Sequence, residues 1–285
     1  MVFFGAVSIS FGPLLIKSVE TGATAAAFYR MLFGGLTLLL LVAVKRLQIR
    51  PSREALSFIL LAGAAFSGDL FFWHRSIHLA GPGLSTILAN FQVFILAALG
   101  VLFFGERPST RLFIAIGLAF AGLMLLLEPG LGGMPPGLAR GVAYGLVTAC
   151  FLSVYILSLR QTRRVATPLP LISNMALVSF AASALLALVL CFEGGSFALT
   201  SLKDAGLLTL YGIGCQAVGW LMVSAGLPHI PPGRGGLLLM AEPLFAFIWD
   251  VAFLGRPTGA MGYAGASVTT FAIYLCLGAK KQNKE

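Results

Sequence analysis

The chain has 285 residues, 58% of them hydrophobic and only 10% charged, and its mean hydropathy is +0.95. These values lie far outside the usage of soluble domains, so a soluble globular protein is excluded and a bilayer is the expected surrounding. The net charge of +9 would indicate a nucleic-acid partner for a soluble protein. In a membrane chain the placement of Lys and Arg reports orientation instead, so no nucleic-acid partner is expected.

Apolar segments of roughly 20 residues, the length that crosses a bilayer as a helix, recur along the whole chain. The expected spans are 1–19, 25–44, 55–79, 83–104, 112–127, 138–159, 169–192, 205–227, 236–254 and 261–279. The first span begins without a basic segment and is expected to be a retained helix rather than a cleaved signal peptide. The pattern predicts an all-α integral membrane protein with ten transmembrane helices and no separate soluble domain.

The distribution of basic residues predicts the orientation. Ten spans place both termini on one side, and 13 of the 19 Lys and Arg residues fall in the termini and loops of that side. Short cytoplasmic loops carry an excess of positive charge, so we expect both termini in the cytoplasm and anionic lipid as the contact of this face. The expected location is the plasma (inner) membrane of a bacterium, with the chain crossing it many times.

Ionisable residues inside the first spans are candidate site residues, because each costs roughly 2.5 to 3.5 kcal/mol in a bilayer. Arg30 in the second span is expected to bind an anionic group or Asp69; alternatively, it reaches the nearby surface. Asp69 and Trp73 lie four residues apart and so share one face of the third span. Asn90 is the polar candidate in the fourth span.

The later spans repeat this pattern. Gln216 and Trp220 have the same spacing in the eighth span, so an acid, an amide and two indoles could face one cavity; indoles suit flat or cationic ligands. The alternative makes the tryptophans a belt at the membrane surface and Gln216 a packing residue. Glu242, followed by Pro243, could mark an irregular helix segment that carries a proton or binds a cation. The alternative is a helix end that reaches water.

Other motifs give weaker signals. His74 and His78 have the spacing of metal ligands, but no third ligand is evident, so no metal and no cofactor are expected. Gly141 and Gly145 form a GxxxG pattern, which favours close helix packing over dimerisation, although a homodimer remains an alternative.

The two halves of the chain are weakly similar to each other. The segment from Trp73 to Gly105 has a counterpart from Trp220 to Gly255, and each half holds five expected spans. Because five is odd, the second half must enter the membrane inverted relative to the first. The expected organisation is one five-helix repeat over residues 1–137 and a second over 138–285, with a substrate site near the midplane where they meet.

These residues resemble the EamA family of the drug/metabolite transporter superfamily, whose halves each carry a Trp, a Pro-aromatic stretch and a Gly-Glu before the next helix. The residues that carry the resemblance are Tyr29, Arg30, Trp73, Gly105, Glu106, Arg107, Trp220, Glu242, Pro243, Phe245 and Gly255. The chain departs from the pattern at Gln92, which stands near the first-half Pro position, and at Arg256, which stands at the second-half Glu position. The resemblance covers essentially the whole chain, and it implies exporters of amino acids, nucleosides, drugs and other metabolites.

The leading functional interpretation is a secondary transporter that exports a small-molecule substrate by alternating access, with protons as a candidate coupling ion. No GxxxxGK[ST] motif occurs, so transport is expected to run on gradients rather than on ATP. The alternatives are a channel or a membrane protein that does not transport, and, less favoured, an enzyme embedded in the membrane. An enzyme would need a nucleophile–base pair or a metal cluster, and the sequence shows none.

Overall fold

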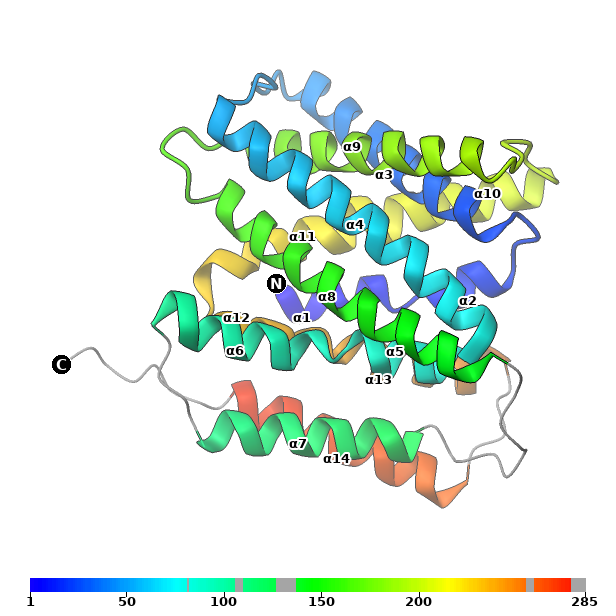
Figure 1. Cartoon of the computed structure of the whole chain (residues 1–285), viewed down its shortest axis with the longest axis vertical. Coiled ribbons are helices and arrows are strands. Elements are labelled where there is room, and N and C mark those ends of the chain that lie inside the picture. Colours follow the sequence, from blue (N-terminus) through cyan, green and yellow to red (C-terminus); the bar gives the residue numbers. More distant parts are fainter. Residues whose placement is uncertain (81, 106–109, 127–136, 255–258, 278–285) are drawn as a thin grey trace.

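The computed structural model describes residues 1–80, 82–105, 110–126, 137–254 and 259–277, and the regular structure within them is helical throughout (Figure 1). The helices of the first half are α1 Val2–Ile9, α2 Gly12–Lys17, α3 Ala23–Val44, α4 Arg53–Ala80, α5 Pro82–Ala89, α6 Gln92–Phe104 and α7 Thr110–Leu126. Those of the second half are α8 Leu138–Thr162, α9 Leu171–Phe192, α10 Leu202–Tyr211, η1 Gly212–Gly219, α11 Trp220–Gly226, η2 Leu227–His229, α12 Pro232–Leu239, α13 Ala241–Leu254 and α14 Ala260–Leu277.

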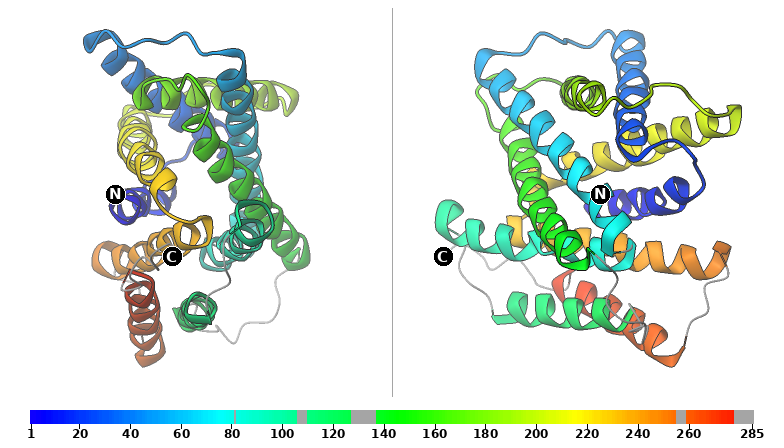
Figure 2. Two further views of the ribbon diagram at one scale, coloured as in Figure 1. Left: turned by 90° about the vertical axis from the view of Figure 1, so that its left-hand side faces the viewer. Right: turned by 45° about the vertical axis from the view of Figure 1, so that its right-hand side comes forward.

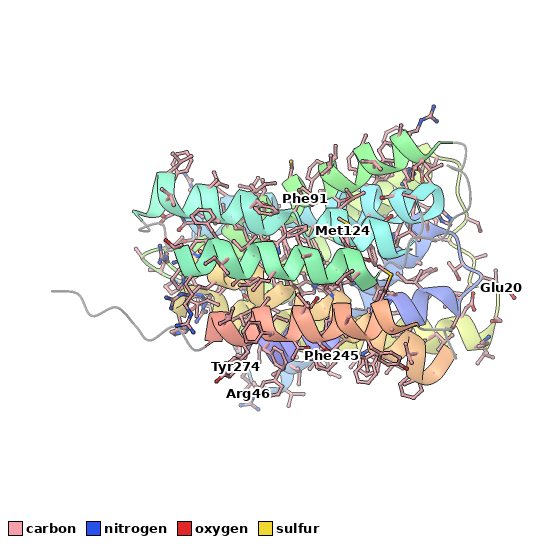
Figure 3. All side chains as sticks on the ribbon, turned by 90° about the horizontal axis from the view of Figure 1, so that it is seen from below. Glu20, Arg46, Phe91, Met124, Phe245 and Tyr274 are labelled. Atoms are coloured by element: carbon pink, nitrogen blue, oxygen red, sulfur yellow. The ribbon has the colours of Figure 1, made fainter. Side chains whose placement is uncertain are left out.

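The lengths and surfaces of these helices fit a protein that crosses a membrane several times. Seven helical segments among the described residues are long and apolar enough to span a bilayer. Large apolar side chains point outward, including Phe113, Phe271 and Tyr274, which is 67% exposed. Figure 3 shows Met124 of α7 and Tyr274 of α14, both exposed, on the side of the molecule that these two helices form.

The helices pack largely as pairs along their lengths. Helix α4 packs against α8, α3 packs against α9, and α7 packs against α14, so that each pair includes one helix from each half of the chain. The pair α7–α14 forms a layer at the lower edge of Figure 1 and of both views in Figure 2. Helix α12 packs against α6 and lies between this layer and the rest of the bundle.

Several of the expected spans are interrupted helices. Span 1–19 is divided into α1 and α2 at Ser10 and Phe11, span 83–104 into α5 and α6 at Asn90 and Phe91, and span 236–254 into α12 and α13 at Met240. Two of these breaks have a proline as their local cause. Pro13 and Pro243 lack the N–H that would bond to the carbonyl four residues earlier, so the helix cannot continue through them unchanged.

The span expected at 205–227 is a helix that changes its winding. It begins as α10, continues as the π-helix η1, and returns to α-helical geometry in α11 at Trp220. Glycine allows this segment to approach its neighbours closely: a Cβ on Gly34 of α3 would lie 2.6 Å from Cβ of Gln216, and one on Gly5 of α1 would lie 2.6 Å from the carbonyl oxygen of Gly219. Larger residues at Gly5 and Gly34 would push η1 away from α1 and α3.

The all-α prediction is confirmed for the described residues. The spans at 1–19, 83–104 and 205–227 are not continuous α-helices. The physical reason is local: apolar composition sets the length of a segment in lipid, but it does not require continuous α-helical winding. Glu106, Arg107 and Arg256 lie outside the described residues.

Candidate functional site

A cavity lies inside the bundle, and both halves of the chain contribute to its wall. The lining residues are Ile9, Arg30, Phe66, Asp69, Leu70, Trp73, Thr86, Ala89, Asn90, Gln92, Leu152, Trp220, Leu239 and Glu242. Its ionisable members are one arginine and two carboxylic acids, so the fully ionised cavity carries one more negative than positive charge. A cavity that joins apolar walls with a few charged groups is the usual form of a small-molecule site.

The helix interruptions converge on this cavity. Ile9 is the last residue of α1, Leu239 is the last residue of α12, and Asn90 lies in the turn between α5 and α6. Glu242 follows the break between α12 and α13 by two residues. Irregular backbone is tolerated at membrane depth where protein buries it or where it lines a cavity, so the location of the breaks agrees with the polar lining.

Arg30 enters the cavity from α3 and is held by aromatic residues. Its Nη1 donates to the hydroxyl of Tyr211 at 2.7 Å, and its Cζ lies 4.7 Å from the ring centre of Tyr211 and 5.2 Å from that of Phe66. The residue is only 4% exposed, so it does not reach toward the surface as the alternative interpretation had it. This geometry presents a fixed positive charge to the cavity, because the aromatic faces attract the guanidinium.

The two carboxylates face the cavity without hydrogen bonds. Asp69 on α4 is 6% exposed and Glu242 on α13 is partly buried. Arg30 attracts both electrostatically. Within the described residues, however, neither carboxylate accepts a hydrogen bond, and neither has an oxygen within 4.0 Å of the Arg30 guanidinium. Both are therefore available to a proton or a cation that enters the cavity.

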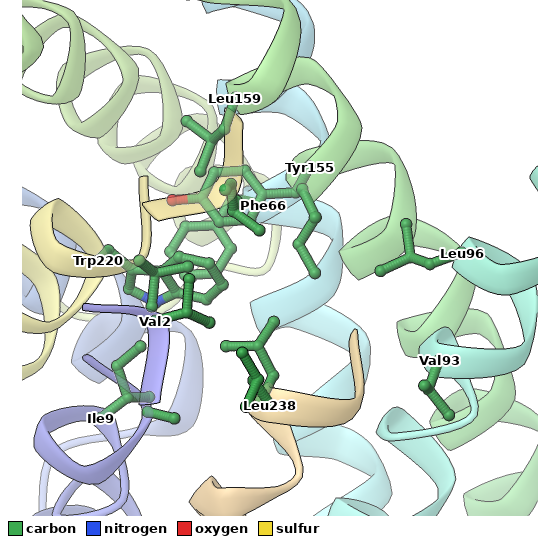
Figure 4. Packing of buried hydrophobic residues seen from close by; sticks show 14 of the residues in the cluster. Val2, Ile9, Phe66, Val93, Leu96, Tyr155, Leu159, Trp220 and Leu238 are labelled. Atoms are coloured by element: carbon green, nitrogen blue, oxygen red, sulfur yellow. The ribbon is translucent and has the colours of Figure 1, made fainter. Parts of the chain in front are cut away.

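The predicted tryptophans also lie in the interior. Trp73 is 7% and Trp220 is 3% exposed, so neither belongs to a belt at the membrane surface. Trp220 packs edge-on against Phe66 and Tyr155, with ring centres 5.2 and 4.7 Å away, as Figure 4 shows from close by. Asn90 also lines the cavity, and its Nδ2 donates to the carbonyl of Thr86 at 2.8 Å.

Gln216 is the one predicted site residue that does not line the cavity. It is fully buried, and its Nε2 donates to Ser179 Oγ of α9 at 3.1 Å. The expectation that Gln216 and Trp220 share a face assumed α-helical winding. Residue 216 lies in the π-helix η1 and Trp220 begins α11, and the Gln216 amide is held by Ser179 of α9 rather than at the cavity wall.

Some lining and supporting residues were not predicted from the sequence. Phe66 and Leu70 could have been found, because with Asp69 and Trp73 they follow the i, i+3, i+4, i+7 spacing of one helix face. Tyr211 carries no such signal: its contact with Arg30 joins residues far apart in the chain. Among the described residues, no group of three or more His, Cys, Asp or Glu side chains could hold a metal ion.

Comparison with known proteins gives the family. The sequence profile described as "EamA-like transporter family" matches the chain twice, over residues 1–128 and 139–278. The chain is 27% identical over 253 residues to "Uncharacterized protein PA1977" of Pseudomonas aeruginosa, which covers 85% of this chain and 79% of that protein. It is 24% identical over 266 residues to "Uncharacterized transporter YwfM" of Bacillus subtilis. This alignment covers 92% of this chain and 87% of that protein.

A solved structure shares the fold. A crystal structure of a protein superposes with a TM-score of 0.83 over 97% of both chains, at 18% sequence identity, and this likeness shows the fold alone. The family follows from the sequence, since the profile matches nearly the whole chain in two halves. This chain belongs to the EamA-like transporter family and is a multi-pass membrane protein of a transporter family.

Proposed function

We propose that the chain is a secondary transporter that exports a small metabolite, such as an amino acid, a nucleoside or a drug-like compound, across the bacterial plasma membrane by alternating access. The observation that supports this best is the cavity between the two halves, where Asp69 and Glu242 face the interior and accept no hydrogen bond from the residues that the structure describes. Each buried ionisable group costs roughly 2.5 to 3.5 kcal/mol in a bilayer, so two unbonded carboxylates are retained for chemistry rather than for stability.

The charges suggest how the cycle could run. Arg30 offsets one of the two negative charges, and the second needs a proton or a cationic group before the cavity can close in a low-dielectric surrounding. Binding a proton or a cation at Glu242 or Asp69 would therefore favour closure, and its release would favour opening. If residues 1–137 and 138–285 are inverted repeats, as proposed from the sequence, the same movement can open the cavity to either side in turn.

Glu242→Gln tests the central role of this carboxylate. The variant keeps the shape of the side chain but removes its charge and its proton, so we expect transport by proteoliposomes to fall to background across pH 5.5 to 8.5, roughly the range in which a perturbed Glu titrates. The transported compound would come from a thermal-shift screen of the wild-type protein against amino acids, nucleosides and amines. A Gln variant that transports at the wild-type rate with the same pH profile would remove Glu242 from the mechanism.

The orientation is proposed from the basic residues and has its own test. With both termini in the cytoplasm, the loop between α3 and α4 is cytoplasmic and the loop between α9 and α10 is external. In a background without the native cysteines, Ser52→Cys should resist a membrane-impermeant thiol reagent in intact cells, whereas Gly194→Cys should react. The reverse labelling pattern would invert the orientation.

A further inference from the structure

Glu242 has a counterpart in the first half of the chain that is not an acid. Helix α5 begins at residue 82 and α12 at residue 232, and both have eight residues. The helices that follow them, α6 and α13, end at Phe104 and Leu254, which are again 150 positions apart. Gln92 precedes Glu242 by the same 150 positions. Gln92 therefore has the place in the first half that Glu242 has in the second.

Both residues lie just after a helix interruption, and both line the cavity. Gln92 begins α6 after the turn at Asn90 and Phe91, and Glu242 follows the break at Met240. Gln92 is also one of the positions at which the chain departs from the family pattern. The features common to the family therefore do not account for this glutamine.

One end of the Gln92 amide is fixed. The side chain is fully buried, and its Nε2 donates to the carbonyl oxygen of Gly236 on α12 at 3.3 Å. A backbone carbonyl can only accept, so the NH2 group, and not the oxygen, must face Gly236. Helices α6 and α12 pack closely at this point (Figure 1), because a Cβ on Gly236 would lie 3.1 Å from Cα of Val93. Backbone packing thus sets the direction of the amide.

The other end of the amide has no partner. Gln92 Oε1 is buried and accepts no hydrogen bond from the described residues. Most buried polar groups in proteins are paired, because an unpaired one gives up its bonds to water without replacement. Since Gln92 lines the cavity and its NH2 group is occupied, its oxygen is available to a donor that enters the cavity.

The neutral charge of this acceptor matters, because the cavity already has charged ones. Asp69 and Glu242 together carry one negative charge more than Arg30 offsets. A third carboxylate, at position 92, would leave two negative charges without compensation in a low-dielectric surrounding. An amide supplies an acceptor at this position without adding charge, so it fits a neutral N–H or O–H donor.

We propose that Gln92 is a substrate-binding residue and the neutral counterpart of Glu242. Its Oε1 accepts one hydrogen bond from a neutral N–H or O–H group of the transported compound, while Glu242 takes the proton or the cationic group. Because the two positions correspond in the two halves, a carboxylate can serve the site from either of them. This inference rests on the proposed transport function and adds a residue that determines specificity.

Exchanging the two side chains tests the correspondence. Glu242→Gln alone should reduce transport to background, and adding Gln92→Glu returns a carboxylate to the cavity from the other half. We expect the double variant to recover at least about a tenth of the wild-type rate, since moving one charge-assisted contact costs on the order of tenfold. The transported compound is the one among the screened amino acids, nucleosides and amines that stabilises the wild-type protein most. A double variant that melts like the wild type and transports no better than Glu242→Gln would overturn the proposal.

Removal of the amide is the second arm, and it adds no charge. Gln92→Met keeps the length of the side chain and removes the free acceptor, so we expect the same compound to bind about fivefold to tenfold more weakly. Gln48→Met is the matched control. Nε2 of Gln48 also donates to a backbone carbonyl, that of Arg50, at 3.3 Å, but Gln48 is exposed in the loop between α3 and α4. A lowered melting temperature of Gln92→Met without weaker binding would show a packing role only, and would overturn the proposal.

The two proposals can fail separately. Wild-type transport by Glu242→Gln, together with weaker binding by Gln92→Met, would reject the role of Glu242 and retain Gln92 as a binding residue. Background transport by Glu242→Gln, with no recovery in the double variant and wild-type binding by Gln92→Met, would retain the transport function and reject the role of Gln92.

Discussion

Two pairs of carboxylates in this protein have opposite surroundings. Asp69 and Glu242 face the cavity and accept no hydrogen bond from the described residues. Glu193 at the end of α9 and Asp204 in the first turn of α10 lie at one end of the bundle, where donors bind both of them. We call the contacts of this second pair the α9–α10 network.

Asp204 is the most fully bonded acid of the network. Its Oδ2 accepts from the backbone N–H groups of Glu20 and Thr21 at 3.0 and 3.1 Å, from the Thr21 hydroxyl at 2.8 Å and from the Thr200 hydroxyl. Its own N–H donates to Ser201, the residue that caps α10. Asp204 is covered by the loops around it, at the end of the molecule, and it ties the start of α10 to the turn before α3.

Glu193 joins three helices. One carboxylate oxygen binds the guanidinium of Arg75 on α4, and the other accepts from Thr24 Oγ1 on α3 at 2.8 Å. Arg75 also donates to the carbonyl of Phe71 at 3.0 Å. The network therefore connects the ends of the two helices that carry Arg30 and Asp69 into the cavity.

Hydrogen bonding distinguishes carboxylates that stabilise the fold from carboxylates that serve the site more clearly than burial does. Asp204 is 2% and Asp69 is 6% exposed, so exposure alone would place them in one class. A bonded carboxylate stabilises the fold through its donors, whereas an unbonded one destabilises it and persists where a ligand or a proton requires it. Three substitutions test this distinction, from the largest expected effect to the smallest.

Asp69→Asn should have the largest effect, and only on transport. Removing an unbonded charge from the interior should leave the melting temperature unchanged or raise it, while transport falls by about 100-fold, a loss of about 2.7 kcal/mol in the transported state. Transport assays in proteoliposomes and thermal melts in detergent measure the two quantities. A lowered melting temperature together with normal transport would place Asp69 among the structural acids and break the comparison.

Asp204→Ala should reverse this pattern. The substitution leaves several donors without an acceptor, so we expect the melting temperature to fall on the order of 5 °C or more. Protein that remains folded should still transport at a rate close to that of the wild type. Thr209→Ala on the same helix is the control, because its hydroxyl donates to the carbonyl of Ala205 within the helix. If Asp204→Ala abolishes transport without a loss of stability, the network belongs to the mechanism.

Glu193→Gln should have the smallest effect. The side chains of Arg75 and Glu193 are 26% and 33% exposed, and ion pairs open to solvent contribute about 0.5 to 1 kcal/mol. A double-mutant cycle with Arg75→Gln, followed by thermal melts at low and high salt, isolates the pair energy. A coupling energy well above this range, or one that salt does not reduce, would show that the pair acts as part of the interior.

The sequence alone predicted that the protein lies in a bilayer, and it identified most of the candidate site residues. Segments long enough to cross a bilayer are visible in composition, because lipid thickness sets their length. Arg30, Asp69 and Glu242 stand out because a charge in an apolar run is a local exception, and all three line one cavity. The spacing of Asp69 and Trp73 was also informative, since α4 is a regular helix through both.

Only the tertiary structure decided which atoms meet. The contact of Arg30 with Tyr211 joins distant segments, and no local pattern encodes it. Gln216 donates to Ser179 of α9 from the π-helical segment 212–219, which lies close to α3 at Gly34. The same packing places the Gln216 amide beside the Tyr155 hydroxyl. Composition sets where a segment resides, but hydrogen-bond partners depend on directions in space, which the neighbouring helices fix.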